Sequence, residues 1–121
     1  MKILSVDDTF ENRMIIARYL HTLYAIDEAE NGIEAIQKAR REKYALILMD
    51  ISLAGALDGR TAAKEIRKIS GYEHVPIIAI TGYAMPDDKE QFLKDGFNGY
   101  LAKPYRKNQL IEIINEHLNH E

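Results

Sequence analysis

The stretch Leu46-Ile47-Leu48-Met49-Asp50 places four consecutive apolar residues directly before an aspartate. A short run that is apolar at every position is typical of a strand covered on both faces, as in parallel sheets. Three further runs are apolar at all or nearly all positions and also end at polar residues: Ile3–Val6, which contains Ser5, before Asp7-Asp8, Ile77–Ile80 before Thr81, and Tyr100–Ala102 before Lys103. We therefore expect four strands of one parallel sheet.

The segments between these runs show the apolar spacing of amphipathic helices. Their apolar residues fall into five groups: Ile15 to Leu23, Ile33 to Ala39, Ala62 to Ile69, Phe92 to Gly96, and Leu110 to Leu118. Tyr24–Glu30 suits an edge strand, and Pro86-Asp87-Asp88 suits a helix start. The alternation predicts one α/β domain over residues 1–121, a doubly wound five-stranded parallel sheet with helices on both faces.

Length and composition exclude several classes of protein. A chain of 121 residues has the length of one domain, and we expect no tethered output domain within it. The net charge is −3 and the basic residues are scattered, so we expect no nucleic-acid or membrane partner. Cysteine is absent, which excludes disulfides and thiolate chemistry. No stretch suits a membrane span or a signal peptide, so we expect a cytoplasmic domain.

The polar residues that follow the strands predict a phosphoryl site. The carboxyl ends of parallel strands meet at one edge of a sheet, so Asp7, Asp8, Asp50, Thr81 and Lys103 should converge there. Three acids in one crevice repel each other unless a cation lies among them, and carboxylates with phosphate oxygens suit Mg²⁺. An aspartate at this place can act as a nucleophile towards phosphorus.

Each of these residues also has a plain structural interpretation. Asp50 could form a turn, Asp7 or Asp8 could cap the following helix, Thr81 could bond to the backbone, and Lys103 could be a solvated surface residue. A helix cap needs only one acid, however. The structural interpretations also leave unexplained why a polar residue appears at the same end of every central strand.

Five motifs in order give the chain a resemblance to a known family. They are Val6-Asp7-Asp8, Leu48-Met49-Asp50-Ile51, Asp58-Gly59, Ile80-Thr81-Gly82 and Tyr100-Leu101-Ala102-Lys103-Pro104. From Lys2 to about His117 the chain resembles a receiver domain of two-component response regulators. The resemblance implies a flavodoxin-like (βα)5 fold with strand order 2-1-3-4-5. It also implies a phosphoprotein whose only chemistry is its own phosphorylation and dephosphorylation.

The resemblance further implies that Asp50 accepts a phosphoryl group from a phosphohistidine. The donor would be a sensor histidine kinase or a histidine phosphotransfer protein in a phosphorelay. Asp8, Asp50 and the backbone carbonyl of Ser52 would ligate Mg²⁺ or Mn²⁺, while Asp7 would act through water. We expect a monomer or a weak dimer that depends on phosphorylation.

A conformational switch is implied in the same way. Thr81 and Lys103 would hold the phosphoryl oxygens, and Thr81 would move towards them while Tyr100 rotates inward. This would alter the face made by the fourth helix, fifth strand and fifth helix, from about Asp87 to Asn119, where a downstream protein binds. Tyr100 could equally be an ordinary half-buried strand aromatic.

Four neighbouring residues are expected to modulate the site. Ser52 and Tyr83 each follow a site residue by two positions, where the family sets the rate of phosphate loss, and we hypothesise that the Tyr83 ring shields the acyl phosphate from water. Gly82 would leave room for the phosphoryl group, although a turn glycine fits as well. We expect a cis bond before Pro104, which would direct the preceding lysine into the site.

Two other functions use similar features. A Mg²⁺-dependent phosphohydrolase with an aspartyl-phosphate intermediate would need the same acids. Such enzymes usually carry another acid two residues after the nucleophile, where this chain has Ser52. A flavin-binding protein would need a hydroxyl- and glycine-rich loop after the first strand, where this chain has two acids and Phe10.

Overall fold

The computed structural model describes residues 1–53, 55, 57–82 and 88–118. Strands and helices alternate along the chain. The strands are β1 (Lys2–Val6), β2 (Ala25–Ala29), β3 (Leu46–Asp50), β4 (Ile77–Thr81) and β5 (Gly99–Ala102). The helices are α1 (Phe10–Leu20), α2 (Gly32–Arg41), α3 (Gly59–Arg67), α4 (Asp88–Lys94) and α5 (Lys107–Leu118). None of these described helices has the length and apolar character needed to cross a bilayer.

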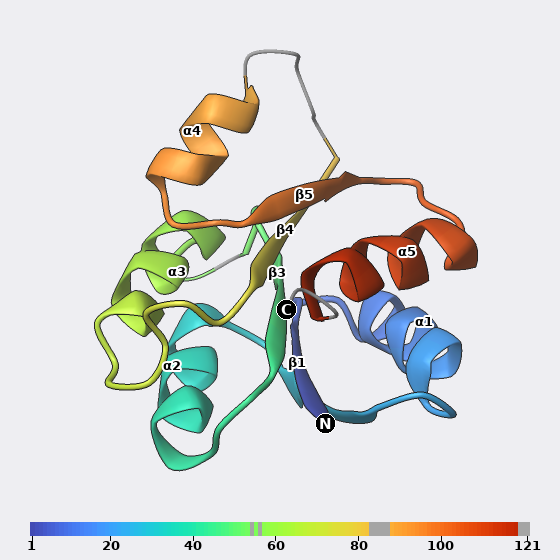
Figure 1. The fold of residues 1–121 in the computed structure, drawn as a ribbon, viewed down its shortest axis with the longest axis horizontal. Helices are drawn as coiled ribbons and strands as arrows, with labels where there is room; N and C mark the ends of the chain where they lie inside the picture. Colours follow the sequence, from blue (N-terminus) through green and yellow to red (C-terminus); the bar gives the residue numbers. More distant parts are fainter. Residues whose placement is uncertain (54, 56, 83–87, 119–121) are drawn as a thin grey trace.

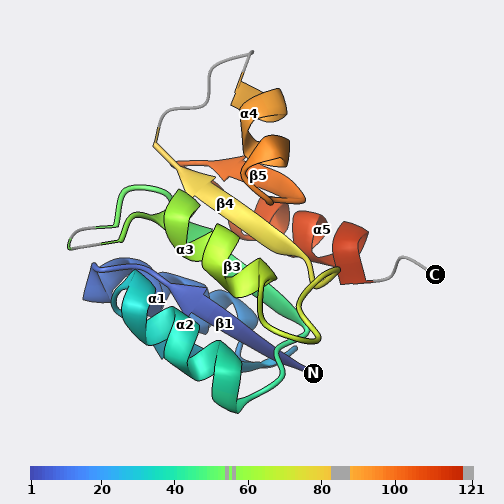
Figure 2. The same ribbon diagram turned by 90° about the vertical axis from the view of Figure 1, so that its left-hand side faces the viewer.

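The five strands form one parallel sheet in the order β2-β1-β3-β4-β5. Helices α1 and α5 cover one face of the sheet, and α2, α3 and α4 cover the other (Figure 1). Figure 2 views the sheet from the side of α2 and α3. The doubly wound fold and its predicted strand order are confirmed.

Two hydrophobic cores explain why the central strands are apolar at nearly every position before their carboxyl ends. In β3, Ile47 and Met49 belong to the core under α2 and α3, whereas Leu46 and Leu48 belong to the core under α1 and α5. Successive side chains of a strand point to opposite faces, so a strand covered on both sides needs apolar residues throughout. All five residues of β3 are buried, including the final Asp50.

The structure corrects several details of the predicted elements. Asp50 and Thr81 are the last residues of β3 and β4 rather than the first residues after them. Four residues assigned to apolar helical groups are exposed: Ile15, Leu23, Ile33 and Leu93. Leu23 lies beyond the end of α1, because the chain leaves the helix at its C-cap, His21. The predicted helix start at Pro86-Asp87 lies outside the described residues.

Candidate functional site

The register of the sheet brings the predicted site residues to one edge. The paired residues nearest this edge are Val6 with Met49, Asp50 with Ile80, and Thr81 with Ala102. Asp7 follows β1 directly, so it lies beside the end of β3. The Lys103 backbone N–H donates to the Thr81 carbonyl at 2.7 Å, which places Lys103 beside the end of β4.

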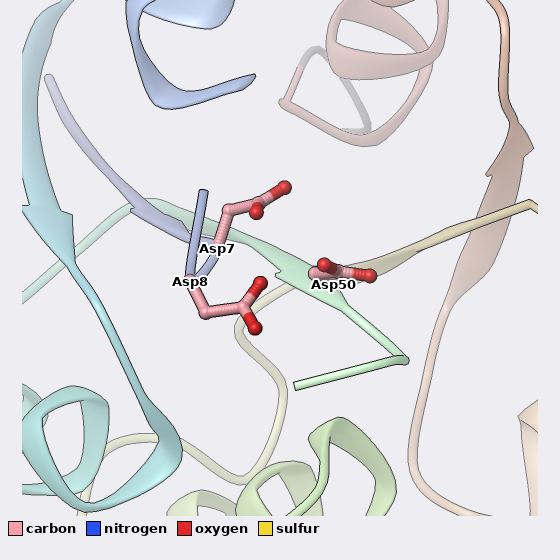
Figure 3. Close-up of side chains that lie close together, drawn as sticks. All are labelled: Asp7, Asp8 and Asp50. Atoms are coloured by element: carbon pink, nitrogen blue, oxygen red, sulfur yellow. The ribbon is translucent and has the colours of Figure 1, made fainter. Parts of the chain in front are cut away.

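Three carboxylates from two strand ends form a compact cluster. Asp7, Asp8 and Asp50 each present an oxygen within 4.8 Å of the others, and their side chains lie close together in Figure 3. Asp7 and Asp50 are only 3% and 4% exposed, whereas Asp8 faces solvent. Within the part of the chain that the structure describes, this is the one group of three or more potential metal ligands. The cluster is therefore buried at its base and open at Asp8.

Lys103 supplies a positive charge beside two of these acids. Its Nζ lies 3.6 Å from Asp50 Oδ1 and 3.8 Å from Asp7 Oδ2, with the side chain 30% exposed. The bond between Lys103 and Pro104 is cis, the geometry that the family resemblance implies. Thr81 is 4% exposed and ends the strand next to β3. One ammonium thus lies beside two of the three carboxylates of the cluster.

Short-range hydrogen bonds orient the two buried acids. Asp50 Oδ1 accepts from the Ser52 backbone N–H at 3.0 Å. Asp7 Oδ1 accepts from the Thr9 backbone N–H at 2.9 Å and lies 3.5 Å from the Asn12 side-chain amide. Both carboxylates therefore have one oxygen held by the chain that follows their own strand.

The Asp7 carboxyl has a raised pKa, which shows that the site disfavours its charged form. Burial is the main cause, and the charge of Asp50 raises the pKa further. The Thr9 N–H and the Lys103 ammonium act in the opposite direction but do not outweigh burial. A divalent cation among the acids would relieve both the burial penalty and the repulsion. The all-oxygen donor set fits Mg²⁺ or Mn²⁺.

Gly59 holds α3 against the backbone of Asp50. A Cβ atom at Gly59 would lie 2.2 Å from the Asp50 carbonyl oxygen and 2.9 Å from Ile51 Cα. Asp58 caps the same helix, its Oδ1 accepting from the Thr61 N–H at 2.8 Å. In the sequence the Asp58-Gly59 pair is a turn signal and one of the motifs of the family resemblance. The structure adds a physical reason, since only glycine permits this close approach.

Tyr100 belongs to β5, and its ring packs against Phe92 of α4. Its ring is half-buried, with the centroid 5.4 Å from that of Phe92. The Arg60 guanidinium lies 4.7 Å from the Phe92 ring centroid, and Arg60 Nη1 is 2.5 Å from Asp95 Oδ2. The side chain of Arg60 thus links the first turn of α3, next to Gly59, to the aromatic pair that includes Tyr100.

The remaining predicted residues have simpler positions. Gly82 is exposed, and a Cβ atom there would meet nothing within 4 Å. Ser52 is exposed. Tyr83 and the two ends of the predicted output face, Asp87 and Asn119, lie outside the described residues, so the shielding role of Tyr83 stays a prediction.

Sequence reasoning missed Arg13, Arg60 and Asp95. Arg13, in α1, is 6% exposed and Asp95, which follows α4, is 3% exposed, although charged side chains are ordinarily solvated. Their partners come from other elements of the fold, and the apolar periodicity of the sequence carries no signal for such pairs.

Comparison with known proteins gives the site a context. The sequence matches the family model of the response regulator receiver domain over residues 3–115. It is 37% identical over 116 residues to two-component system protein A of Emericella nidulans, and 31% identical over 115 residues to the signal transduction histidine-protein kinase BarA of Escherichia coli. These matches cover 93% and 94% of this chain but only 17% and 12% of the relatives.

Two solved structures are similar to this chain over nearly its whole length. Chemotaxis protein CheY4 of Vibrio cholerae has a TM-score of 0.91 at 28% identity, covering 97% of this chain and 98% of that one. The receiver domain of the sensor histidine kinase PA1611 from Pseudomonas aeruginosa, which has a magnesium ion coordinated in its active site cleft, has a TM-score of 0.89 at 38% identity, covering 98% of each chain. By fold, strand order and a family match over residues 3–115, the chain belongs to the response regulator receiver domain family of two-component signalling.

Proposed function

We propose that the domain is a switch that accepts a phosphoryl group on Asp50. The donor is a phosphohistidine of a sensor histidine kinase or of a histidine phosphotransfer protein. The observation that carries this proposal is the cluster of three carboxylate oxygens within 4.8 Å of one another, with Lys103 Nζ 3.6 Å from the acid at the end of the central strand. The match to segments of histidine kinases supports the choice of donor.

A divalent cation, Mg²⁺ or Mn²⁺, belongs to this proposal. Asp8, Asp50 and the backbone carbonyl of Ser52 would hold the ion directly, and Asp7 would contact it through water. When bound, such an ion neutralises charge on the transferring phosphoryl group. The exposed Asp8 carboxylate leaves the cluster accessible from solvent, and the raised pKa of Asp7 supports a need for added positive charge.

The residues of the chain itself orient the transfer. A carboxylate oxygen of Asp50 forms a bond to phosphorus as the bond from phosphorus to the imidazole nitrogen breaks, and that nitrogen retains the electron pair. Lys103 then contacts a phosphoryl oxygen, for which its place between Asp7 and Asp50 is suitable. The Thr81 hydroxyl, at the end of the neighbouring strand, donates to another phosphoryl oxygen. Attack by water on phosphorus later regenerates the carboxylate.

The output of the switch would be read at the face formed by α4, β5 and α5. A cavity of about 360 Å³ opens on this face, and its lining includes Phe92, Tyr100 and His117. Movement of Thr81 towards the phosphoryl group would free space for the Tyr100 ring, which packs on Phe92 in this structure. A downstream protein that binds this cavity would therefore distinguish the two states.

Incubation with acetyl phosphate and Mg²⁺, followed by intact mass measurement, tests the proposal. The parent chain should gain one phosphoryl group that hydroxylamine removes and that a chelator prevents. Asp50→Asn should gain none. Asp27→Asn is a matched control, because its carboxylate lies in β2 and bonds to the Tyr44 hydroxyl at 2.7 Å, away from the cluster.

The alternative of a phosphohydrolase gives a different result in the same experiment. A hydrolase would release many equivalents of phosphate from simple phosphate esters, whereas a receiver should not. Adduct formation on the Asp50→Asn variant at the parent rate would show that another residue is the acceptor.

A further inference from the structure

Arg13 is a nearly buried cation that contacts the backbone of Asp7, one of the three acids of the cluster. It belongs to α1 and is only 6% exposed. Its Nη1 donates to the Asp7 backbone carbonyl at 2.7 Å. Its Nε donates to Glu28 Oε1 at 2.9 Å, and its Nη2 lies 3.5 Å from Glu30 Oε1. One guanidinium thus joins the loop after β1 to the end of β2.

These contacts fix the peptide from which Asp8 extends. The Asp7 N–H donates to the Ala29 carbonyl at 3.1 Å, and the Asp7 carbonyl accepts from Arg13. Both polar groups of the Asp7 backbone are therefore held, and the Asp7 side chain is held separately by the Thr9 N–H. The direction in which the chain leaves β1, and with it the position of the Asp8 carboxylate, follows from these bonds.

We propose that Arg13 is a positioning residue for the cation site. It orients the Asp7–Asp8 peptide so that the Asp8 carboxylate faces Asp50, while Glu28 and Glu30 offset its charge. This inference rests on the cation site of the proposed function. Residues that orient metal ligands without touching the metal commonly change metal affinity by about 10–100-fold when they are replaced.

Charge and geometry predict opposite effects when Arg13 is replaced by a neutral residue. Removing a positive charge near three carboxylates, and leaving Glu28 and Glu30 without their partner, strengthens the attraction for a cation. Losing the bond to the Asp7 carbonyl leaves Asp8 less well placed and weakens binding. The sign of the change in affinity therefore separates a positioning role from a purely electrostatic one.

Calorimetric titration with Mg²⁺ of the parent, Arg13→Gln, Arg13→Lys and Arg18→Gln provides the test. Arg18→Gln is the matched control, since it makes the same change at an exposed position of the same helix. We expect Arg13→Gln to bind Mg²⁺ about tenfold more weakly. Arg13→Lys keeps the charge but cannot reach all three partners, so its affinity should fall less. Arg18→Gln should bind as the parent does.

The outcomes are distinguishable. Affinity of Arg13→Gln equal to or above that of the parent overturns the positioning role, while the cation site itself stands. Circular dichroism establishes whether each variant is folded. If Arg13→Gln is unfolded, the Mg²⁺ affinity of Arg13→Lys provides the test instead. Because this variant keeps the positive charge, any loss of affinity has a geometric cause. Binding of Mg²⁺ to Arg13→Lys as tight as to the parent then overturns the proposal. Absence of Mg²⁺ binding to the parent would instead refute the cation site.

Discussion

Replacing Gly59 by alanine tests the contact between α3 and the strand that carries Asp50. The added Cβ atom would lie 2.2 Å from the Asp50 carbonyl oxygen, and Cβ contacts under 3.0 Å are essentially never found. The first turn of α3 or the end of β3 must therefore move by about 0.8 Å, the difference between these two distances. Because the nearest atoms belong to the backbone, no flexible side chain can absorb the displacement.

The expected loss of stability follows from two opposing effects. Forcing an extra methyl group into a packed region costs about 1–3 kcal/mol. The lower freedom of alanine in the unfolded chain returns about 0.4–1 kcal/mol. Since β3 is fully buried and paired on both sides, we expect the packing cost of Gly59→Ala at the upper end, and a net loss of about 2 kcal/mol.

Urea unfolding followed by far-ultraviolet circular dichroism measures this difference. Gly82→Ala is the control, because a Cβ atom there meets nothing within 4 Å. It should change the free energy of unfolding by no more than about 0.5 kcal/mol. If Gly59→Ala were as stable as Gly82→Ala, α3 would not rest on the Asp50 carbonyl.

Three further predictions concern charged residues with partners in other elements of the fold. Burial would raise the pKa of Asp95, but hydrogen bonds, above all from Arg60, hold it below 3.8. The stability that the ionised Asp95 carboxylate contributes is therefore present above about pH 3.8 and is lost as the pH falls through its lowered pKa. Asp95→Asn should lower the free energy of unfolding by about 1–3 kcal/mol at pH 7 and by less in acid. A loss in urea unfolding that does not change with pH would contradict this prediction. The Arg67 guanidinium donates to three backbone carbonyls, so Arg67→Ala should lower the free energy of unfolding by about 2–3 kcal/mol, with little recovery in Arg67→Lys. Lys103→Gln should slow phosphorylation by acetyl phosphate about 100-fold, because the ammonium that contacts the phosphoryl group is lost. It should strengthen Mg²⁺ binding, because a positive charge beside the acids is removed. A variant that loses both phosphorylation and Mg²⁺ affinity would show that Lys103 does not act beside the acids.

Much of the fold could be predicted because burial on both faces leaves a strong pattern in the sequence. The run Leu46–Met49 is apolar throughout since its side chains alternate between two cores. Five βα units allow few arrangements once the crossovers are right-handed. The meeting of the acids at the strand ends could also be predicted, because parallel strands bring their carboxyl ends to a common edge of the sheet.

Other features depend on contacts that no local pattern encodes. Arg60 and Asp95 are 35 residues apart, and nothing near either residue indicates that α3 and α4 bring them together. Arg13 is buried because Asp7 and the end of β2 surround it, whereas a basic residue in a helix ordinarily suggests a solvated face. The exposure of Ile33, at the first turn of α2, shows the converse case of an apolar residue outside the core.

Diffraction from crystals of the protein soaked in Mn²⁺ tests whether the three acids hold a divalent cation, because the anomalous signal locates the ion without reference to activity. We predict one strong site, with the ion about 2.0–2.2 Å from carboxylate oxygens of both Asp8 and Asp50. A well-occupied Mn²⁺ site elsewhere, with no ion between these two residues, would contradict it.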